Sequence, residues 1–427
     1  MILNAPVIIT LVIFFLAYGL IISEKINRTV VALLGASLIL FANVITQEQA
    51  IQYIDFNTLG LLIGMMIIVG ITRRTGVFEY MAIKAAKLAK GDPLLILVTL
   101  SAVTALTSAL LDNVTTVLLI VPITFSICNE LEIDPVPFLI SQILASNIGG
   151  TATLIGDPPN IMIGSAAGLS FMDFLNNLFV PILLTFIATM LVFRVVYRKQ
   201  LIASAIAKSR IMNLPEIEAI KDYALLKKSL FVLALTVLGF ITHNMLHLEP
   251  ATIALGGATL LMFITKEEPE DILLAVEWPT LFFFAGLFII VGALNHVGVI
   301  EWVARESIEA TGGALISTTM LILWLSAIAS AFIDNIPFVA TMIPLIQKMG
   351  QIGGIENLRP FWWALSLGAC LGGNGTLIGA SANVIVAGLA EKNGIVITFR
   401  GFMKIAFPLM LLSIIISSFY ILLAYLI

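Results

Sequence analysis

The chain has 427 residues, of which 60% are hydrophobic and 11% charged, and its mean hydropathy is +1.08. A water-soluble domain holds about 25% charged residues, so this composition excludes that class and predicts a polytopic α-helical membrane protein. The formal net charge of −4 is small, and no nucleic-acid partner is expected. Cys128 and Cys370 fall in separate halves without a ligand spacing, so neither a disulfide nor a metal site is expected.

The predicted transmembrane segments form two series of apolar runs that approach the length of a membrane span, about 20 residues. The run 5–22 lacks a basic n-region and a small-residue cleavage site, which predicts a retained first span. The first series lies at 7–23, 30–45, 58–71, 94–110, 137–165 and 175–196, and the second at 230–246, 252–264, 280–294, 315–331, 361–390 and 402–427. The polar, Lys- and Arg-rich stretch 197–228 between them predicts a cytosolic linker.

The two series are copies of one another. The sequence IIVG at 67–70 recurs at 289–292, DN at 112–113 recurs at 334–335, and TLIG at 153–156 recurs at 376–379. A nearly constant offset over a whole chain is the mark of an internal repeat. We therefore divide the chain into a first repeat at 1–196, the linker at 197–228 and a second repeat at 229–427.

Each repeat contains a segment whose path decides the orientation of the copies. If 94–127 and 315–346 are helical hairpins that enter and leave by one face, each half crosses the membrane five times and the halves are inverted. With an external N-terminus, only Arg305, Lys348 and Arg359 of the 22 Lys and Arg residues then lie outside. Because cytoplasmic loops carry the excess of Lys and Arg, we expect two inverted repeats of about five helices plus one re-entrant hairpin, with both termini outside.

Both repeats also contain a long apolar run interrupted by residues that break helices. At 146–160 the run 137–165 holds Gly, Thr, Asn, an Asp and a Pro pair, and the run 361–390 has a matching Gly- and Asn-rich stretch. In lipid, unwound backbone is tolerated only where it is buried in protein or lines a wet cavity. Discontinuous helices at matching positions of two repeats are the best sequence indication of a transport site.

Three carboxylates, Asp112, Asp157 and Asp334, fall at membrane depth, and we expect no Lys or Arg beside them. Ionisable groups within a membrane are candidates for a functional site. Asp112 and Asp334 each precede a helical run and could act only as helix N-caps, or could also accept a proton or a cation. Asp157 has Ala380 as its repeat counterpart, so one half carries an extra titratable group.

Neutral polar residues on the same segments could bind a neutral polyhydroxyl solute or a dehydrated cation. As single residues, Ser, Thr and Asn usually form hydrogen bonds between membrane helices, whereas clustering at two breaks and two tips favours a binding site. The set comprises Asn113, Thr115, Thr116, Asn147, Gly150, Thr151, Thr153, Asn160, Asn335, Asn374, Thr376 and Asn383. We predict one central site, in which Asn160 and Asn383 contact the solute rather than only brace the breaks.

The motifs DNVTT at 112–116, GGTATLIGDPPN at 149–160, DNIP at 334–337 and GGNGTLIGASAN at 372–383 resemble those of the ion transporter superfamily. The chain is most similar to its branch of ArsB-type arsenite efflux pumps, P-protein-like permeases and NhaD-type sodium/proton antiporters. The resemblance implies ten crossings plus two hairpins, a homodimer and elevator-type motion. Dicarboxylate and citrate relatives carry Ser-Asn-Thr at both tips, and this chain departs from that pattern.

Several functions remain open. The first is efflux of arsenite or antimonite coupled to proton antiport, because the neutral trihydroxide suits polar neutral ligands beside carboxylates. A sodium/proton antiporter fits the Asp pair equally well, and a citrate or other organic-anion carrier fits least, because carboxylates repel anions. An intramembrane aspartyl protease would need two catalytic aspartates on facing helices. This chain has no Tyr-Asp partner to match Gly156-Asp157, so we do not expect an enzyme.

The expected environment follows from these interpretations. We expect localisation in the plasma (inner) membrane, contact with the lipid bilayer, a small inorganic solute, no cofactor, and H⁺ as the coupling ion with Na⁺ as the alternative. The resemblance implies a homodimer and leaves open a soluble ATPase subunit.

Overall fold

The computed structural model describes residues 4–23 and 25–426, and the regular elements within these ranges are all helices. Eight of them are long and apolar enough to cross a membrane: Ala5–Ser23, Phe56–Arg73, Asn113–Leu131, Phe171–Tyr197, Tyr223–Leu246, Trp278–His296, Leu315–Phe332 and Phe399–Leu426. The expectation of an all-α polytopic membrane protein is confirmed.

The elements of the first half are α1 (Ala5–Ser23), α2 (Arg28–Phe41), α3 (Gln47–Tyr53), α4 (Phe56–Arg73), α5 (Val77–Leu88), α6 (Pro93–Ser108), α7 (Asn113–Leu131), α8 (Val136–Thr151), α9 (Pro158–Ala167) and α10 (Phe171–Tyr197). The linker holds α11 (Ala205–Met212) and the short η1 (Glu216–Ala219). The second half holds α12 (Tyr223–Leu246), α13 (Pro250–Thr265), α14 (Pro269–Leu273), α15 (Trp278–His296), α16 (Val299–Thr311), α17 (Leu315–Phe332), α18 (Asn335–Gly353), α19 (Arg359–Gly372), η2 (Gly373–Gly375), α20 (Ser381–Lys392), α21 (Phe399–Ile421) and η3 (Leu422–Leu426).

The linker is more ordered than its composition suggests, and it is shorter than predicted. Helix α12 begins at Tyr223, inside the range assigned to the linker, because the Asp222 carboxylate caps its first turn. That carboxylate accepts hydrogen bonds from the backbone N–H groups of Ala224 at 2.8 Å and Leu225 at 2.9 Å. An N-terminal cap of this kind satisfies N–H groups that have no partner within the helix.

Helices α6 and α7 leave and return to the same side of the molecule, because α11 holds both outer ends of the pair. Lys208 of α11 forms an ion pair with Asp92, which caps α6, at 3.3 Å. Arg210 of α11 pairs with Glu132, directly after α7, at 2.5 Å. The connection between the two helices at 109–112 therefore forms the inner tip of a helical hairpin.

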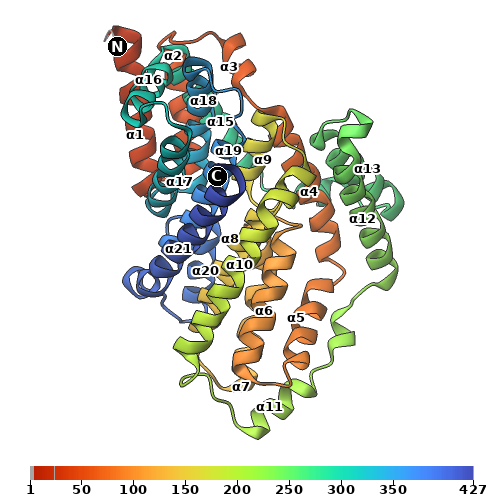
Figure 1. Cartoon of the computed structure of the whole chain (residues 1–427). Coiled ribbons are helices and arrows are strands. Elements are labelled where there is room, and N and C mark those ends of the chain that lie inside the picture. The colour runs from red at the N-terminus through yellow and green to blue at the C-terminus, as the bar shows by residue number, and fades with distance from the viewer. Residues whose placement is uncertain (1–3, 24, 427) are drawn as a thin grey trace.

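Helices α17 and α18 form the equivalent hairpin, and α16 holds its outer ends. The Thr318 hydroxyl near the start of α17 donates to the Thr311 hydroxyl of α16 at 2.9 Å, and Gly353 at the end of α18 lies against Ile308 of α16. Figure 1 shows α11 at the lower end of the molecule and α16 at the upper end. The two hairpins therefore enter from opposite ends, although the orientation of the repeats in a bilayer stays a prediction.

The two broken helices occupy the centre of the molecule. Helices α8 and α19 are buried along almost their whole length and contact each other. The first break lies between α8 and α9, where Pro158 and Pro159 have no N–H to continue the helical ladder. The second lies between α19 and α20 and contains η2.

Glycine at two repeat-related positions lets the unwound backbone turn tightly. A Cβ on Gly156 would lie 2.6 Å from the Gly150 carbonyl oxygen, and a Cβ on Gly379 would lie 2.6 Å from the Gly373 carbonyl oxygen. Only glycine permits backbone segments to approach so closely. The breaks predicted from sequence are thus present and built alike in both halves.

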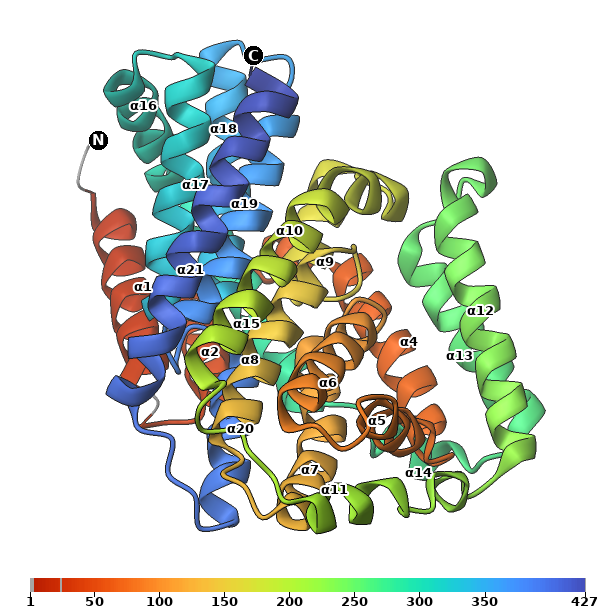
Figure 2. The ribbon, with the colours of Figure 1, turned by 60° about the horizontal axis from the view of Figure 1, so that its bottom comes forward.

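Further helices flank this centre. Helix α2 packs against α1 and α15 on one side, and α4 packs against α13 on the other. Figure 2 shows α1 on the left edge and α12 with α13 on the right edge, with the hairpins and broken helices between them. Large apolar side chains on α12, including Phe231, Leu235 and Leu238, are exposed and suited to contact lipid.

Candidate functional site

Asp112 and Asp334 lie at the tips of the two hairpins and cap α7 and α18. One Asp112 oxygen accepts the Thr115 N–H at 2.8 Å and the other accepts the Thr115 hydroxyl at 2.5 Å. Asp334 accepts the Ile336 N–H at 3.0 Å. The capping role considered from the sequence is therefore present in the structure, and the remaining lone pairs of the Asp112 carboxylate are available to a proton or a cation.

Asp157 occupies the position between the two tips. Its carboxylate is fully buried, and the amide nitrogens of Asn113 and Asn335 each lie 3.4 Å from its oxygens. These two asparagines follow the capping aspartates of the first and second hairpins. A single carboxylate from the first break thus contacts both repeats, and the second break has Ala380 in its place.

A small cavity lies where the tips and the first break meet. Its volume is about 20 Å³, and its lining includes Arg28, Asp112, Asn113, Asp157, Glu277 and Asn335. A volume of this size holds about one water molecule. The cavity of this conformation therefore suits a proton, a water molecule or one small cation better than a large solute.

Arg28 and Glu277 also line this cavity, and the expectation that no Lys or Arg lies beside the carboxylates is wrong. An Arg28 guanidinium nitrogen lies 3.1 Å from the Asp334 carboxylate and donates to the Ser381 hydroxyl at 2.5 Å. The guanidinium also lies over the Phe283 ring, 4.9 Å from its centroid. In the sequence, Arg28 and Glu277 stand directly before apolar runs. A charged residue in that position is equally expected at the membrane interface, so the sequence alone did not assign these two residues to the site.

Asn147 links the two repeats behind the cavity. Its amide nitrogen donates to the side-chain oxygens of Asn374 at 2.9 Å and Asn383 at 3.0 Å, and its own oxygen accepts a bond from Asn113 at 3.0 Å. All four side chains are buried. Such an amide network holds the second break in register with the first hairpin.

Asn160 and Asn383 brace the two breaks. The Asn160 amide donates to the backbone oxygens of Thr151 at 3.0 Å and Thr153 at 2.9 Å. The Asn383 amide donates to those of Gly373 and Thr376, both at 2.8 Å. Neither asparagine lines the cavity in the part of the chain that the structure describes, so this conformation favours the bracing alternative over solute contact.

Three threonines of the predicted site donate their hydroxyl groups to backbone carbonyls. The Thr153 hydroxyl donates to the Ala109 carbonyl at 2.5 Å, and the Thr376 hydroxyl donates to the Ala331 carbonyl, so each break is tied to its hairpin tip. Thr151 donates to the Asn147 carbonyl at 2.6 Å. The structure thus gathers the predicted residues in one region but separates those that line the cavity from those that support it.

The structure places the side chains or backbone of four predicted residues as follows. The Thr115 hydroxyl donates to the Asp112 carboxylate at 2.5 Å. The Thr116 hydroxyl is buried without a hydrogen-bond partner among the described residues, and so is the Asn374 amide nitrogen. Gly150 lies against the Gly156 carbonyl, where a Cβ would approach within 2.5 Å. These positions support the packing of the tip and the breaks.

Comparison with known proteins identifies the kind of molecule that carries this site. The family model described as "Citrate transporter" (CitMHS) matches residues 18–368. The chain belongs to this family. An uncharacterized transporter of Mycobacterium tuberculosis is 45% identical over 423 residues, covering 98% of each chain, and a 46 kDa membrane protein of Mycobacterium leprae is 44% identical over 426 residues, covering 98% of this chain and 99% of that one.

More distant members extend the comparison. The human P protein is 34% identical over 491 residues, which cover 96% of this chain and 59% of that protein. The YdaH transporter of Alcanivorax borkumensis has a similar fold, with a TM-score of 0.58, 14% identity and 98% of each chain covered. The chain is therefore a membrane transporter, and the resemblance to the ion transporter superfamily is confirmed. The closer resemblance to arsenite pumps stays a prediction.

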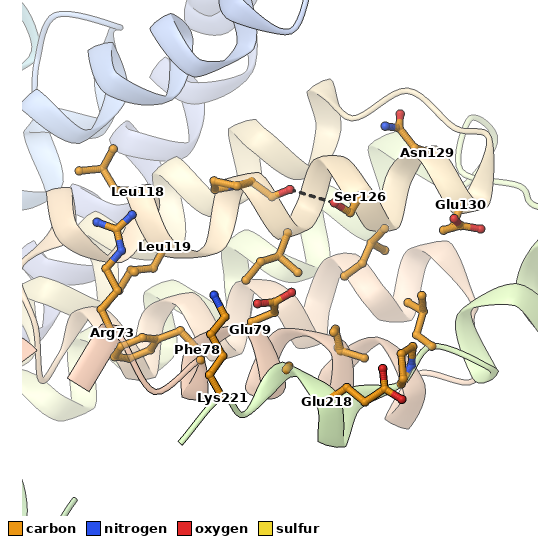
Figure 3. A pocket seen from close by; sticks show the side chains of 18 residues that line it. Arg73, Phe78, Glu79, Leu118, Leu119, Ser126, Asn129, Glu130, Glu218 and Lys221 are labelled. Carbon is orange, nitrogen blue, oxygen red and sulfur yellow. Dashed lines mark hydrogen bonds between the residues drawn. The ribbon is translucent and has the colours of Figure 1, made fainter. Parts of the chain in front are cut away.

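A larger crevice adjoins the site of this transporter. Its volume is about 880 Å³, and it lies between α5, α7 and the linker, with Arg73, Glu79 and Lys221 among its charged lining residues (Figure 3). Val114 lines the small cavity and Leu118, one turn further along α7, lines the crevice. One helical turn rises about 5.4 Å, so along α7 the linings of the two hollows lie about one turn apart.

Proposed function

We propose that the chain is a secondary active transporter that exchanges protons for a small inorganic solute through the cavity between the hairpin tips. The observation that carries this proposal is the convergence of Asp112, Asp157 and Glu277 on one cavity, with Asp334 beside it. Carboxylates at membrane depth are costly to bury, and where they occur they commonly belong to an ion pathway or a proton relay.

The size and charge of the cavity favour a monovalent cation as the solute. Four carboxylates surround or adjoin it and one guanidinium opposes them, so the field attracts cations. About 20 Å³ accommodates a dehydrated Na⁺ together with oxygen ligands from Asp157 and the asparagine amides. Sodium/proton antiport is therefore the leading candidate.

Efflux of arsenite or antimonite with proton antiport is the second candidate. The side chains of Asn113 and Asn335 present neutral donors and acceptors at the cavity, which suits a neutral trihydroxide. This solute is larger than one water molecule, so its binding requires a more open conformation than the present one. Citrate, which the family name suggests, needs a still larger opening and a less acidic lining.

The crevice beside the linker supplies the route for solute on one side of the membrane. Helices α4 and α7 both extend from the small cavity to the crevice, through Met66 to Arg73 and through Val114 to Leu118. With the linker on the cytoplasmic side of the plasma membrane, as the Lys and Arg count favours, the crevice is a cytoplasmic vestibule. Labelling of Lys208→Cys by an impermeant reagent applied from outside would contradict this orientation.

Parallel flux assays in proteoliposomes test the proposed function. Purified protein is reconstituted with an internal pH dye and an imposed pH gradient, and sodium, arsenite or citrate is added outside. Dissipation of the gradient by sodium supports cation/proton antiport, and arsenite uptake that depends on the gradient supports the second candidate. Transport of citrate alone, independent of pH, would contradict the proposal.

A further inference from the structure

The two hairpin tips differ in one respect that the repeat does not predict. Asp334 at the second tip contacts Arg28 at 3.1 Å and accepts the Ser381 hydroxyl at 2.8 Å. At the first tip the Asp112 carboxylate accepts bonds only from Thr115 among the described residues, and Pro158 stands where the second repeat has Ser381. One capping aspartate is therefore neutralised by a side chain and the other is not.

The contact also joins helices from distant parts of the chain. Arg28 begins α2, which packs against α1 and α15, whereas Asp334 and Ser381 begin α18 and α20, which belong to the second hairpin and the second break. The Arg28 side chain is 30% exposed and that of Asp334 is 14% exposed. The ion pair is thus shielded enough to be strong and close enough to the surface for the guanidinium to swing away into water.

We propose that Arg28 is a tethered counter-ion that competes with the transported cation for Asp334, an inference that rests on the proposed cation/proton exchange. When the cavity is empty, the Arg28 guanidinium binds Asp334. The carboxylates of Asp112 at the first tip and of Asp157 then have no cationic partner among the residues that the structure describes. When a cation loads the cavity, Arg28 is displaced from Asp334 by charge repulsion, because two cations share the field of the same carboxylates.

The surroundings of Arg28 support this competition. Asp334 holds the guanidinium directly, Glu277 lines the same cavity, and Asp112 and Asp157 lie on its other walls. Phe283 provides a ring surface on which the guanidinium rests, at a centroid distance of 4.9 Å. This cation–π contact can hold the Arg28 guanidinium near the cavity when a transported cation occupies Asp334.

Neutralising Arg28 tests the proposal. In Arg28→Gln, the apparent KM for sodium should fall about tenfold, the change expected when a partly buried charge-assisted bond stops competing. Proton leak without sodium should rise, because no internal cation occupies the empty site. Arg28→Lys retains a cation without the guanidinium geometry and should have a KM between those of Arg28→Gln and the wild type. Arg305→Gln, which removes a cation from an exposed pair with Glu301, is the matched control and should change neither quantity.

A second measurement does not depend on flux. Sodium should raise the melting temperature of the purified protein in detergent, and should do so at a lower concentration in Arg28→Gln than in the wild type. If wild-type vesicles exchange no sodium but this shift is present, the proposed function fails and the counter-ion role stands. An unchanged KM and an unchanged sodium dependence of melting in Arg28→Gln would overturn the counter-ion role. A loss of sodium binding in this variant would also overturn it, because a side chain that competes with sodium cannot be required for sodium to bind.

Discussion

Replacing Asn160 by Ala distinguishes a brace from a solute ligand. The substitution removes the donors that satisfy the Thr151 and Thr153 carbonyls and the acceptor that the Ser366 hydroxyl uses at 2.6 Å. Each buried polar group left without a partner costs about 1–3 kcal/mol. With three such groups at a fully buried position, we expect a loss of at least about 3 kcal/mol of stability.

The assay compares melting in detergent with solute affinity in proteoliposomes. Asn393→Ala is the control, because its amide donates to the Leu389 carbonyl at an exposed helix end and should contribute less than about 1 kcal/mol. The brace predicts a large fall in melting temperature for Asn160→Ala and a nearly unchanged KM in the folded fraction. A variant as stable as Asn393→Ala, with an altered KM, would refute the reasoning and restore solute contact.

Three further predictions follow from individual contacts. Asp157→Asn should keep the fold, since the amide preserves the shape, and should lower pH-driven exchange at least about tenfold, because the group between the two tips can no longer titrate; wild-type pH dependence would contradict this. Gly76→Ala should cost more stability than Gly298→Ala. Both glycines have positive φ, but only at 76 would a Cβ collide with the linker backbone, and equal losses would show that the linker yields. The Lys87 ammonium holds the pKa of Glu216 below its ordinary value of 4.5. The stability from this pair is therefore complete above that value and is lost as the pH falls through the lowered pKa, so limited proteolysis of the linker should accelerate only under acid conditions.

Local chemistry in the sequence determined the class of the molecule and the position of its breaks. Apolar runs, the missing N–H groups of Pro158 and Pro159, and the aspartates before two helical runs act over a few residues, so the spans, the first interruption and the caps at Asp112 and Asp334 could be predicted directly. The repeat then transferred each assignment from one half to the other.

Only the tertiary structure decided which polar residues face the cavity. Asn160, Asn383, Thr153 and Thr376 are polar residues within apolar runs, as Asn113 and Asn335 are, yet their side chains bond to backbone carbonyls of the breaks and the hairpin tips. This choice depends on which carbonyls the breaks leave unpaired, and that follows from packing between α8 and α19.

The positive charge that Arg28 brings to the site could not be predicted from the sequence either. Arg28 is separated from Asp334 by 306 positions in the chain and lies on a helix outside both hairpins. Local hydropathy assigns it to a membrane surface, and the repeat offers no counterpart to correct that assignment. Because an ion pair depends on the distance between two folded segments, its presence is a property of how α2 and α18 are placed, and it could be seen only once the chain was folded.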